Sequence, residues 1–289
     1  MLVLPQNKYK LNMKKFTYVI GWNSLNINSG GQIVLYFLCH MLNKIEEKAY
    51  ILGGSFPNVL GLDCPIKPKY LDLQSDNVVT IYPEITNGNP LNAKNVARWI
   101  LYTIGINGGS TTSHGKNDLI FGYQKEFSGN GCLITDENKV TLFYIMNNIY
   151  YNFNPEPRTK SCFMIRKGHK YHTQFNYHPI ESIDISGKSH KELSTIFNLC
   201  HTFYCYDPHT YYSTYASMCG CDSIVVPSAN LSKADWKNSI EDTYGIAYGA
   251  DDLERARKTR PLMLDYIKNQ DNLNIENTHK FVELCESHF

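Results

Sequence analysis

Short apolar runs alternate with helix-like segments along the 289-residue chain, and this alternation limits the fold more than any other sequence feature. Runs rich in Val, Ile, Tyr and Phe are typical of strands buried in a parallel sheet. In the first half, strands are predicted at 16–21, 48–54, 77–84, 118–123 and 140–145, and helices at 31–44 and 92–102. We therefore expect a mixed α/β fold.

The segment NFNPEPRTK, residues 152–160, interrupts the alternation with two prolines and charges of both signs. It is typical of a hinge, so we predict domains at 1–153 and 154–270 and a terminal helix at 271–289. Beyond the hinge, strands are predicted at 161–166, 181–185, 202–206, 223–227 and 245–249. Helices are predicted at 191–200 and 208–218, from about 251 onward, and at 275–285.

Charge and apolar runs exclude several classes of protein. The formal net charge is +1, which produces no overall field attracting nucleic acid, so we expect no nucleic-acid partner. The longest apolar run, 33–42, is interrupted by His40 and is too short to span a membrane. The N-terminus carries its lysines after the apolar residues, the reverse of a secretory signal. Nine cysteines without a C-x-x-C pair indicate reduced thiols, and together these features favour a cytoplasmic protein.

The loop IRKGHK, residues 165–170, places two cations directly after a predicted strand. The carboxyl ends of parallel strands meet at one edge of a sheet, where ligands of α/β proteins bind. Arg166 and Lys167 would suit a diphosphate at that edge. A solvated basic turn is the alternative interpretation.

A second loop is expected at the same edge. The strand at 202–206 ends at Tyr206, Asp207 is placed to cap a helix, and Pro208 suits the first helical position. The start of such a helix offers free N–H groups and a positive dipole end to an anion. The hydroxyl of Thr210 would add a donor to the same phosphate.

The first half contributes a glycine pair and two candidate acid–base groups. Gly30 and Gly31 precede an apolar helix, which indicates close approach of a ligand or a plain turn. Glu84 follows a strand and is a catalytic candidate or a turn carboxylate. His114 lies in the polar loop GGSTTSHGK and is a candidate or merely exposed. The histidines of the second half lack carboxylate or cysteine partners at ligand spacing, so we expect no metal site.

The stretch DPHTYYSTYASMCGCDSIVV, residues 207–226, resembles the nucleotide-binding domain of GT-B glycosyltransferases, especially the retaining family 4 enzymes that build surface polysaccharides. It matches their pattern at Asp207, at Ala216 and at the turn at Gly220. The family has a second carboxylate, which holds the ribose hydroxyls, where this chain has Tyr215. The glycine pair lies where these enzymes keep a glycine loop, and residues 82–105 are similar to a stretch of capsule and glycan transferases.

The resemblance implies two Rossmann-like domains facing a cleft, with the C-terminal helix packing back toward the first. It implies a UDP- or GDP-sugar donor and a glycan or lipid-linked acceptor, with transfer that retains configuration. No D-x-D motif for a divalent cation occurs, which favours a metal-independent reaction without a cofactor. The donor would contact Gly30, Gly31, Arg166, Lys167, Tyr206, Asp207, Thr210 and Tyr211, with Asp207, Glu84 and His114 as catalytic candidates.

Two other functions stay open at this point. One is a GT-B sugar-nucleotide epimerase, which needs no acceptor, and the other is a nucleotide- or glycan-binding protein without turnover. Peripheral contact with a membrane and the oligomeric state are likewise open.

Overall fold

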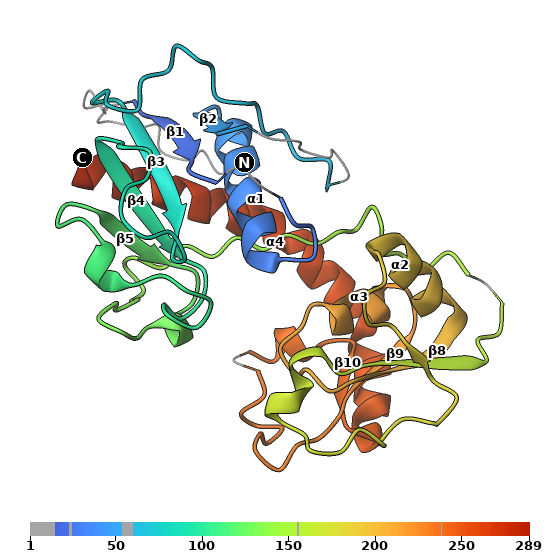
Figure 1. Ribbon diagram of the computed structural model, residues 1–289. Helices are drawn as coiled ribbons and strands as arrows, with labels where there is room; N and C mark the ends of the chain where they lie inside the picture. The colour runs from blue at the N-terminus through green and yellow to red at the C-terminus, as the bar shows by residue number, and fades with distance from the viewer. Residues whose placement is uncertain (1–14, 23–24, 54–59, 155, 238) are drawn as a thin grey trace, which may run out of the picture. The chain divides into compact units, whose positions relative to one another are not determined.

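The computed structural model describes residues 15–22, 25–53, 60–154, 156–237 and 239–289 (Figure 1). The chain divides into two compact units, Met1–Tyr144 with Gln270–Phe289, and Ile145–Asn269. Each unit contains one five-stranded parallel sheet and helices, which confirms the expected mixed α/β class and is compatible with two Rossmann-like domains. The segment 152–160 lies inside the second unit, where the Arg158 guanidinium donates hydrogen bonds to the carbonyls of Phe197 and Cys219.

The first unit is built on a sheet with the strand order β2-β1-β3-β4-β5. The strands are β1 (Thr17–Ile20), β2 (Lys48–Ile51), β3 (Val78–Pro83), β4 (Asn95–Ile100) and β5 (Leu119–Gly122). The helix α1 (Gly30–Lys44) crosses from β1 to β2, and a short 3-10 helix, η2 (Thr111–Ser113), lies between β4 and β5. A second 3-10 helix, η3 (Lys125–Phe127), follows β5.

Helices cover this sheet because its strands are apolar on both faces. α1 buries Leu35, Leu38 and Leu42, and Figure 1 shows it on the side of the sheet nearer the viewer. The C-terminal part of α4 (Leu253–His288) covers the opposite face through Phe281, whose ring lies 5.4 Å from Tyr18 and 5.0 Å from Phe121. The register places these two residues on one face, so the contact joins β1 and β5 across the sheet.

The second unit repeats the same strand order in a different stretch of chain, β7-β6-β8-β9-β10. The strands are β6 (Lys160–Met164), β7 (Ile183–Asp184), β8 (Cys200–Cys205), β9 (Asp222–Val225) and β10 (Ile246–Tyr248). The helices are α2 (His190–Leu199) and α3 (Tyr212–Met218), with 3-10 turns η4 (Arg166–Lys170), η5 (Glu241–Thr243) and η6 (Ala250–Asp252).

The predicted strands and helices of this unit are confirmed apart from their ends, and local chemistry explains several of them. α2 starts at a capping box in which the Ser189 hydroxyl accepts from the Glu192 amide and Glu192 accepts from the Ser189 amide. Phe197 of α2 packs on Phe203 of β8, and Ala256 of α4 packs on Ile224 and Ala247 on the other face. The sheet is therefore buried on both sides.

Three of the secondary-structure predictions are wrong: the helix at 92–102, the strand at 140–145 and the division of the C-terminal segment into two helices. Residues 92–102 hold β4 instead of a helix. The spacing of Val96, Trp99 and Ile100 imitates a helical face, but both faces of this strand are buried, and Arg98 is buried with them. The Arg98 guanidinium donates to the carbonyls of Thr86 and Gly88 and to Asp118, so a strand in the core carries a charge.

Residues 140–145 form no strand, although their apolar pattern predicts one. Neighbouring side chains bond their carbonyls, since Trp99 donates to Val140 and the Tyr123 hydroxyl donates to Leu142. The two helices expected at the C-terminus are one helix, α4, which runs through Pro261. No glycine or second proline interrupts residues 262–288, so nothing ends the helix before His288.

All nine cysteine thiols are free. Within the parts of the chain described above, no helix combines the length and the apolar character needed to cross a membrane.

Asp252, just before α4, accepts hydrogen bonds from Lys233, Arg255 and the Tyr248 amide. Burial alone would raise the pKa of Asp252, but these bonds outweigh it and lower the pKa to about 2. Because the pKa is lower in the folded state, the stabilisation is complete above the usual pKa near 4 and is lost as the pH falls toward 2. We expect Asp252→Asn to lower the free energy of unfolding by roughly 1–3 kcal/mol at pH 7.

Urea unfolding of the wild type and of Asp252→Asn at pH 7 and pH 2.5 measures this effect. The difference between the two proteins should shrink at the lower pH. A difference of the same size at both pH values would show that Asp252 does not act through its charge.

Candidate functional site

The order of the strands locates one edge of each sheet as the place for a site. In both sheets the first strand has the second on one side and the third on the other, so the chain leaves the first and third strands in opposite directions. Ligands of open α/β sheets bind outside the carboxyl ends of the strands at such a switch point. In the second unit this point lies between β6 and β8, and in the first between β1 and β3.

The basic loop of the second unit follows β6 and lies against the end of β8. The Tyr206 amide donates to the Met164 carbonyl at 3.0 Å, which joins the two strand ends. A Cβ atom on Gly168 would lie 2.6 Å from Cβ of Tyr206 and 2.9 Å from its carbonyl carbon. Only glycine allows this approach, so η4 turns tightly over Tyr206 and holds Arg166 and Lys167 at the carboxyl edge.

Arg166 has a backbone conformation that is uncommon for a residue with a side chain. Its φ is +46°, in the left-handed region, which costs about 1 kcal/mol or more. Its guanidinium carbon lies 5.4 Å from the centre of the Tyr212 ring, a distance typical of a cation–π contact. Both Arg166 and Lys167 are exposed, so their charges face solvent at the switch point.

The loop after β8 also lies where the sequence predicts, but it is not the start of a helix. Asp207 is buried, and its carboxylate accepts a hydrogen bond from the His209 amide at 3.2 Å. The Thr210 hydroxyl accepts from the Tyr212 amide at 3.4 Å. These local bonds form turns instead of a cap, so α3 begins at Tyr212 and Pro208 is not its first residue. The prediction of an anion site at the start of a helix at Pro208 is therefore wrong, because α3 starts four residues later and has only seven residues.

Lys237 is a third cation of this edge, and the sequence analysis missed it. The indole of Trp236 donates to the Pro208 carbonyl at 2.8 Å and ties the segment after β9 to the loop after β8. Burial lowers the pKa of Lys237, while Asp242, Cys205 and Asp207 act in the opposite direction. Among the described residues no carboxylate forms an ion pair with its ammonium group. In the sequence, the feature that could have drawn attention to Lys237 is its place next to Trp236.

His209 faces the same group of charges. Burial lowers its pKa, and Lys237 and Lys167 lower it further while Asp207 opposes them. The imidazole is therefore neutral near pH 7 and presents a dipole instead of a charge. Arg166, Lys167 and Lys237 supply the positive potential of this edge, with Asp207 as its buried carboxylate.

Tyr206 and Tyr215 belong to the core of the second unit, whereas Tyr211 is 40% exposed. The Tyr206 hydroxyl accepts from the Tyr177 amide and bonds His178 Nδ1, which occupies the only polar atom of its side chain. Tyr215 is stacked on Tyr150 with ring centres 4.1 Å apart and an interplanar angle of 6°. A ribose cannot reach position 215 in this structure, so the carboxylate that the resemblance expects there has no counterpart at this residue.

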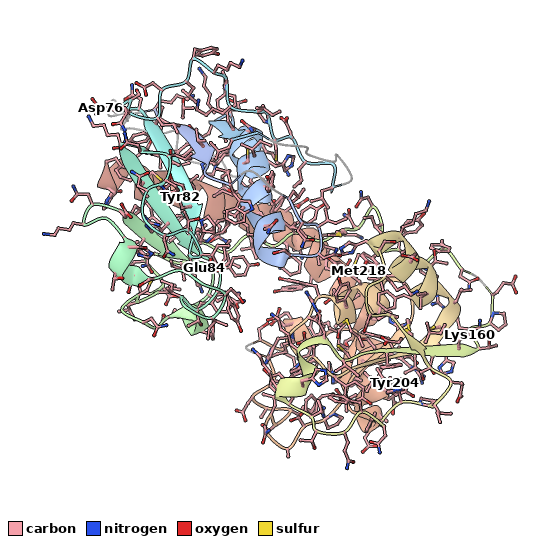
Figure 2. All side chains as sticks on the ribbon, viewed as in Figure 1. Asp76, Tyr82, Glu84, Lys160, Tyr204 and Met218 are labelled. Carbon is pink, nitrogen blue, oxygen red and sulfur yellow. The ribbon has the colours of Figure 1, made fainter. Side chains whose placement is uncertain are left out.

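The switch point of the first unit brings together Gly31 and Glu84, which the sequence places far apart. A Cβ on Gly31 would lie 3.7 Å from Leu101, and the Leu101 amide donates to Glu84 Oε2 at 3.1 Å. Glu84 lies at the carboxyl end of β3, as Figure 2 shows. Its side chain is buried, and burial raises its pKa although the Leu101 bond opposes the shift. Raising the pKa favours the protonated acid that a general acid needs.

At Gly30 and Gly31 the folded chain has room for a residue with a side chain. Neither has a positive φ, and a Cβ on Gly30 would meet no atom within 4 Å. Both lie in the first turn of α1, whose N-cap residue Ser29 makes no side-chain capping bond. The close approach of a diphosphate to this backbone stays a prediction.

His114 lies apart from this switch point, beside the edge strand β5. It follows η2 and lines a cavity with Thr111 and Asp118. Considering the described residues alone, no three His, Cys, Asp or Glu side chains are grouped so that they could hold a metal ion. Comparison with models of known protein families and with curated proteins finds no match.

The two glycine environments predict opposite effects of an added methyl group. Gly168→Ala should lower the free energy of unfolding by about 1–3 kcal/mol, because the new Cβ collides with the Tyr206 backbone. Gly30→Ala should leave it unchanged or raise it by up to about 1 kcal/mol, since the site is open and alanine favours a helix. Denaturant unfolding of both variants checks the pair, and equal effects would contradict the packing described for η4.

Proposed function

We propose that this protein is a GT-B-type glycosyltransferase that moves a sugar from a UDP- or GDP-sugar to a glycan or lipid-linked acceptor. The observation that carries the proposal is the convergence of Arg166, Lys167 and Lys237 on the switch point of the second sheet. Three cations around one loop suit a diphosphate, which carries two or more negative charges. The residues between β8 and α3 supply the resemblance to this class of enzyme.

The chemistry explains why such an edge favours transfer. Breaking the bond between sugar and phosphate leaves negative charge on the diphosphate and positive charge on the sugar. Fixed cations stabilise the departing diphosphate without reorganising, because Gly168 and Trp236 hold their backbones against the ends of β6 and β8. In this proposal the diphosphate is bound by side chains, and the leaving phosphate takes the proton of the acceptor hydroxyl, with retention of configuration.

One observation favours a second candidate, a nucleotide-binding protein without turnover. Tyr215, which is stacked on Tyr150, stands at the sequence position where the resemblance expects the carboxylate that holds the ribose. A transferase would therefore need another group for the ribose hydroxyls, whereas a binding protein would not need to position the sugar for reaction. Transfer of a sugar from the donor to an added acceptor separates the two.

Nucleotide binding is tested by thermal unfolding with UDP, GDP and ADP and with their sugars. At about 100 times its Kd, a nucleotide that binds only the folded protein adds about 2.7 kcal/mol, or roughly 5–10 °C in Tm. Arg166→Ala should remove most of this shift at the same concentration, because it removes a charged contact to the phosphates. Lys160→Ala is the matched control, since this exposed lysine starts the same strand at its opposite end.

The proposal fails if no nucleotide raises Tm, or if Arg166→Ala and Lys160→Ala reduce the shift equally. With the best nucleotide in hand, release of the sugar to an added acceptor distinguishes the transferase from the binding protein. Sugar release to water or isomerisation without an acceptor would instead indicate an epimerase.

Lys237 gives a second, independent prediction for the same site. Lys237→Met keeps the length of the side chain but removes its charge, so nucleotide affinity should fall about tenfold while the protein stays as stable or becomes more stable. Isothermal titration with the best nucleotide, combined with urea unfolding, measures both. Unchanged affinity would place Lys237 outside the phosphate site.

A further inference from the structure

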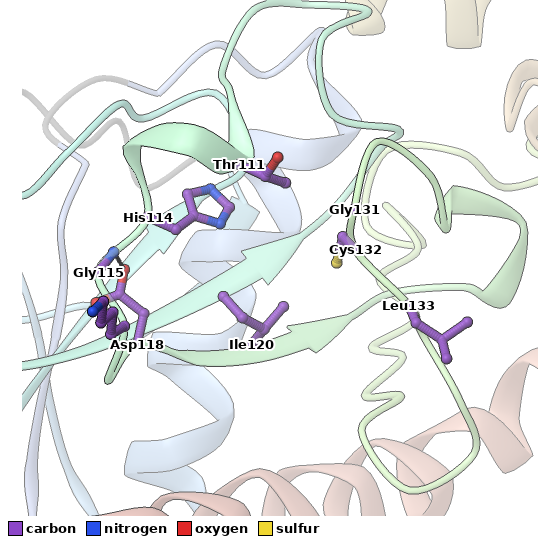
Figure 3. Close-up of a pocket in the computed structure, with 9 residues that line it drawn as sticks. Thr111, His114, Gly115, Asp118, Ile120, Gly131, Cys132 and Leu133 are labelled. Carbon is purple, nitrogen blue, oxygen red and sulfur yellow. Dashed lines mark hydrogen bonds between the residues drawn. The ribbon is translucent and has the colours of Figure 1, made fainter.

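A polar cavity lies in the first unit beside the edge strand β5. It has a volume of about 330 Å³, within the usual range for small-molecule pockets, roughly 300–1,000 Å³. Figure 3 shows its walls, with Thr111 and His114 on one side, Ile120 of β5 below, and the turn that carries Cys132 and Leu133 opposite. None of these residues has a role in the function proposed above apart from His114, a catalytic candidate.

His114 lines this cavity with an imidazole that makes no hydrogen bond within the described part of the chain. Its Nε2 is buried inside the protein, so Nδ1 is the ring nitrogen that a ligand in the cavity can reach. A ligand hydroxyl that bonds Nδ1 adds a hydrogen bond that the folded chain does not make, worth about 1 kcal/mol. Burial lowers the pKa of His114, Arg98 acts in the same direction, and Asp118 opposes them, so the ring is neutral near pH 7.

The carboxylate of the cavity is already paired with a cation. Asp118 Oδ2 accepts from Arg98 Nε at 2.5 Å and from the Gly115 amide at 2.9 Å. Its other oxygen, Oδ1, accepts no hydrogen bond from the described part of the chain. An anion would meet this carboxylate oxygen, and the one further cation of the lining, Lys116, is exposed to solvent. The walls therefore favour a neutral ligand that can donate a hydrogen bond.

The remaining groups suit hydroxyls beside an apolar surface. The Thr111 hydroxyl donates to the Asn130 carbonyl at 2.8 Å, which leaves its oxygen free to accept. Ile120 and Leu133 supply the apolar part of the lining, and Leu133 is 71% exposed at the cavity. Sugars combine hydroxyl groups, each both donor and acceptor, with an apolar C–H face.

We infer that this cavity is a binding site for a neutral sugar or related polyol, with His114 Nδ1, Asp118 Oδ1 and Thr111 Oγ1 bonding its hydroxyls and Leu133 covering its apolar face. A hydroxyl bonds either tautomer of the imidazole, since it can donate to Nδ1 or accept from it. The site needs no nucleotide, so it stands or falls independently of the diphosphate site of the second unit.

The test is ligand-observed NMR with the full chain and methyl glycosides of glucose, galactose, mannose and N-acetylglucosamine, without nucleotide. Binding is expected at Kd values on the order of millimolar. His114→Leu should weaken it at least tenfold, and His114→Gln, which keeps a donor and an acceptor, should weaken it less. Leu133→Asp should also weaken binding, whereas Ile106→Asp, at a comparably exposed residue outside the cavity, should not.

The inference is overturned if none of the glycosides binds at 20 mM, on the order of ten times the expected Kd, or if Leu133→Asp and Ile106→Asp behave alike. It is also overturned if inorganic phosphate binds more tightly than every glycoside and loses affinity in His114→Leu, because the site would then take an anion. Nucleotide-dependent shifts in Tm should be the same in Leu133→Asp as in the wild type.

Discussion

The pairing of β6 with β8 is the contact on which the candidate diphosphate site depends. Parallel pairing aligns the carboxyl ends of these strands, and the bond from the Tyr206 amide to the Met164 carbonyl extends the alignment past the ends of the strands. Gly168 then allows the loop after β6 to fold onto Tyr206. The basic pair and the Asp207 loop, which are far apart in the chain, meet because of these backbone contacts.

Buried charges are held by backbone carbonyls and amides in both units. Arg98 lies in the centre of the first sheet and bonds two carbonyls of the loop after β3 as well as Asp118. Asp252 in the second unit accepts from the Tyr248 amide and from two cations. Removing Asp118 would leave the Arg98 guanidinium buried without its carboxylate, so this pair specifies the position of a loop as well as contributing stability. The Arg98 network fixes Asp118, and through it one wall of the polar cavity.

The two candidate sites differ in how the protein treats charge. At the switch point of the second sheet, Lys167 and Lys237 lie near His209 and the buried Asp207, and we propose this edge as the place for an anion. The cavity beside β5 pairs its carboxylate with Arg98, keeps its histidine neutral and has its one other charged lining residue, Lys116, exposed to solvent, so we infer that it offers mainly hydrogen bonds. One chain thus carries an environment suited to a diphosphate and another suited to hydroxyl groups, the two kinds of group that sugar transfer brings together.

The sequence by itself determined the α/β class, most strands, α1, α2 and the place of the basic loop after β6. These features follow from local apolar patterns and capping residues, which act within a few residues of chain. The prediction was wrong at β4, because tertiary burial of both faces, with Arg98 among the buried residues, produced a pattern that resembles a helix. It was also wrong at the start of α3, where local turns at Asp207 and Thr210 form instead of a cap. Only the tertiary structure revealed the place of Lys237, the cavity that His114 lines and the burial of Tyr215, because each depends on groups brought together from separate strands and loops.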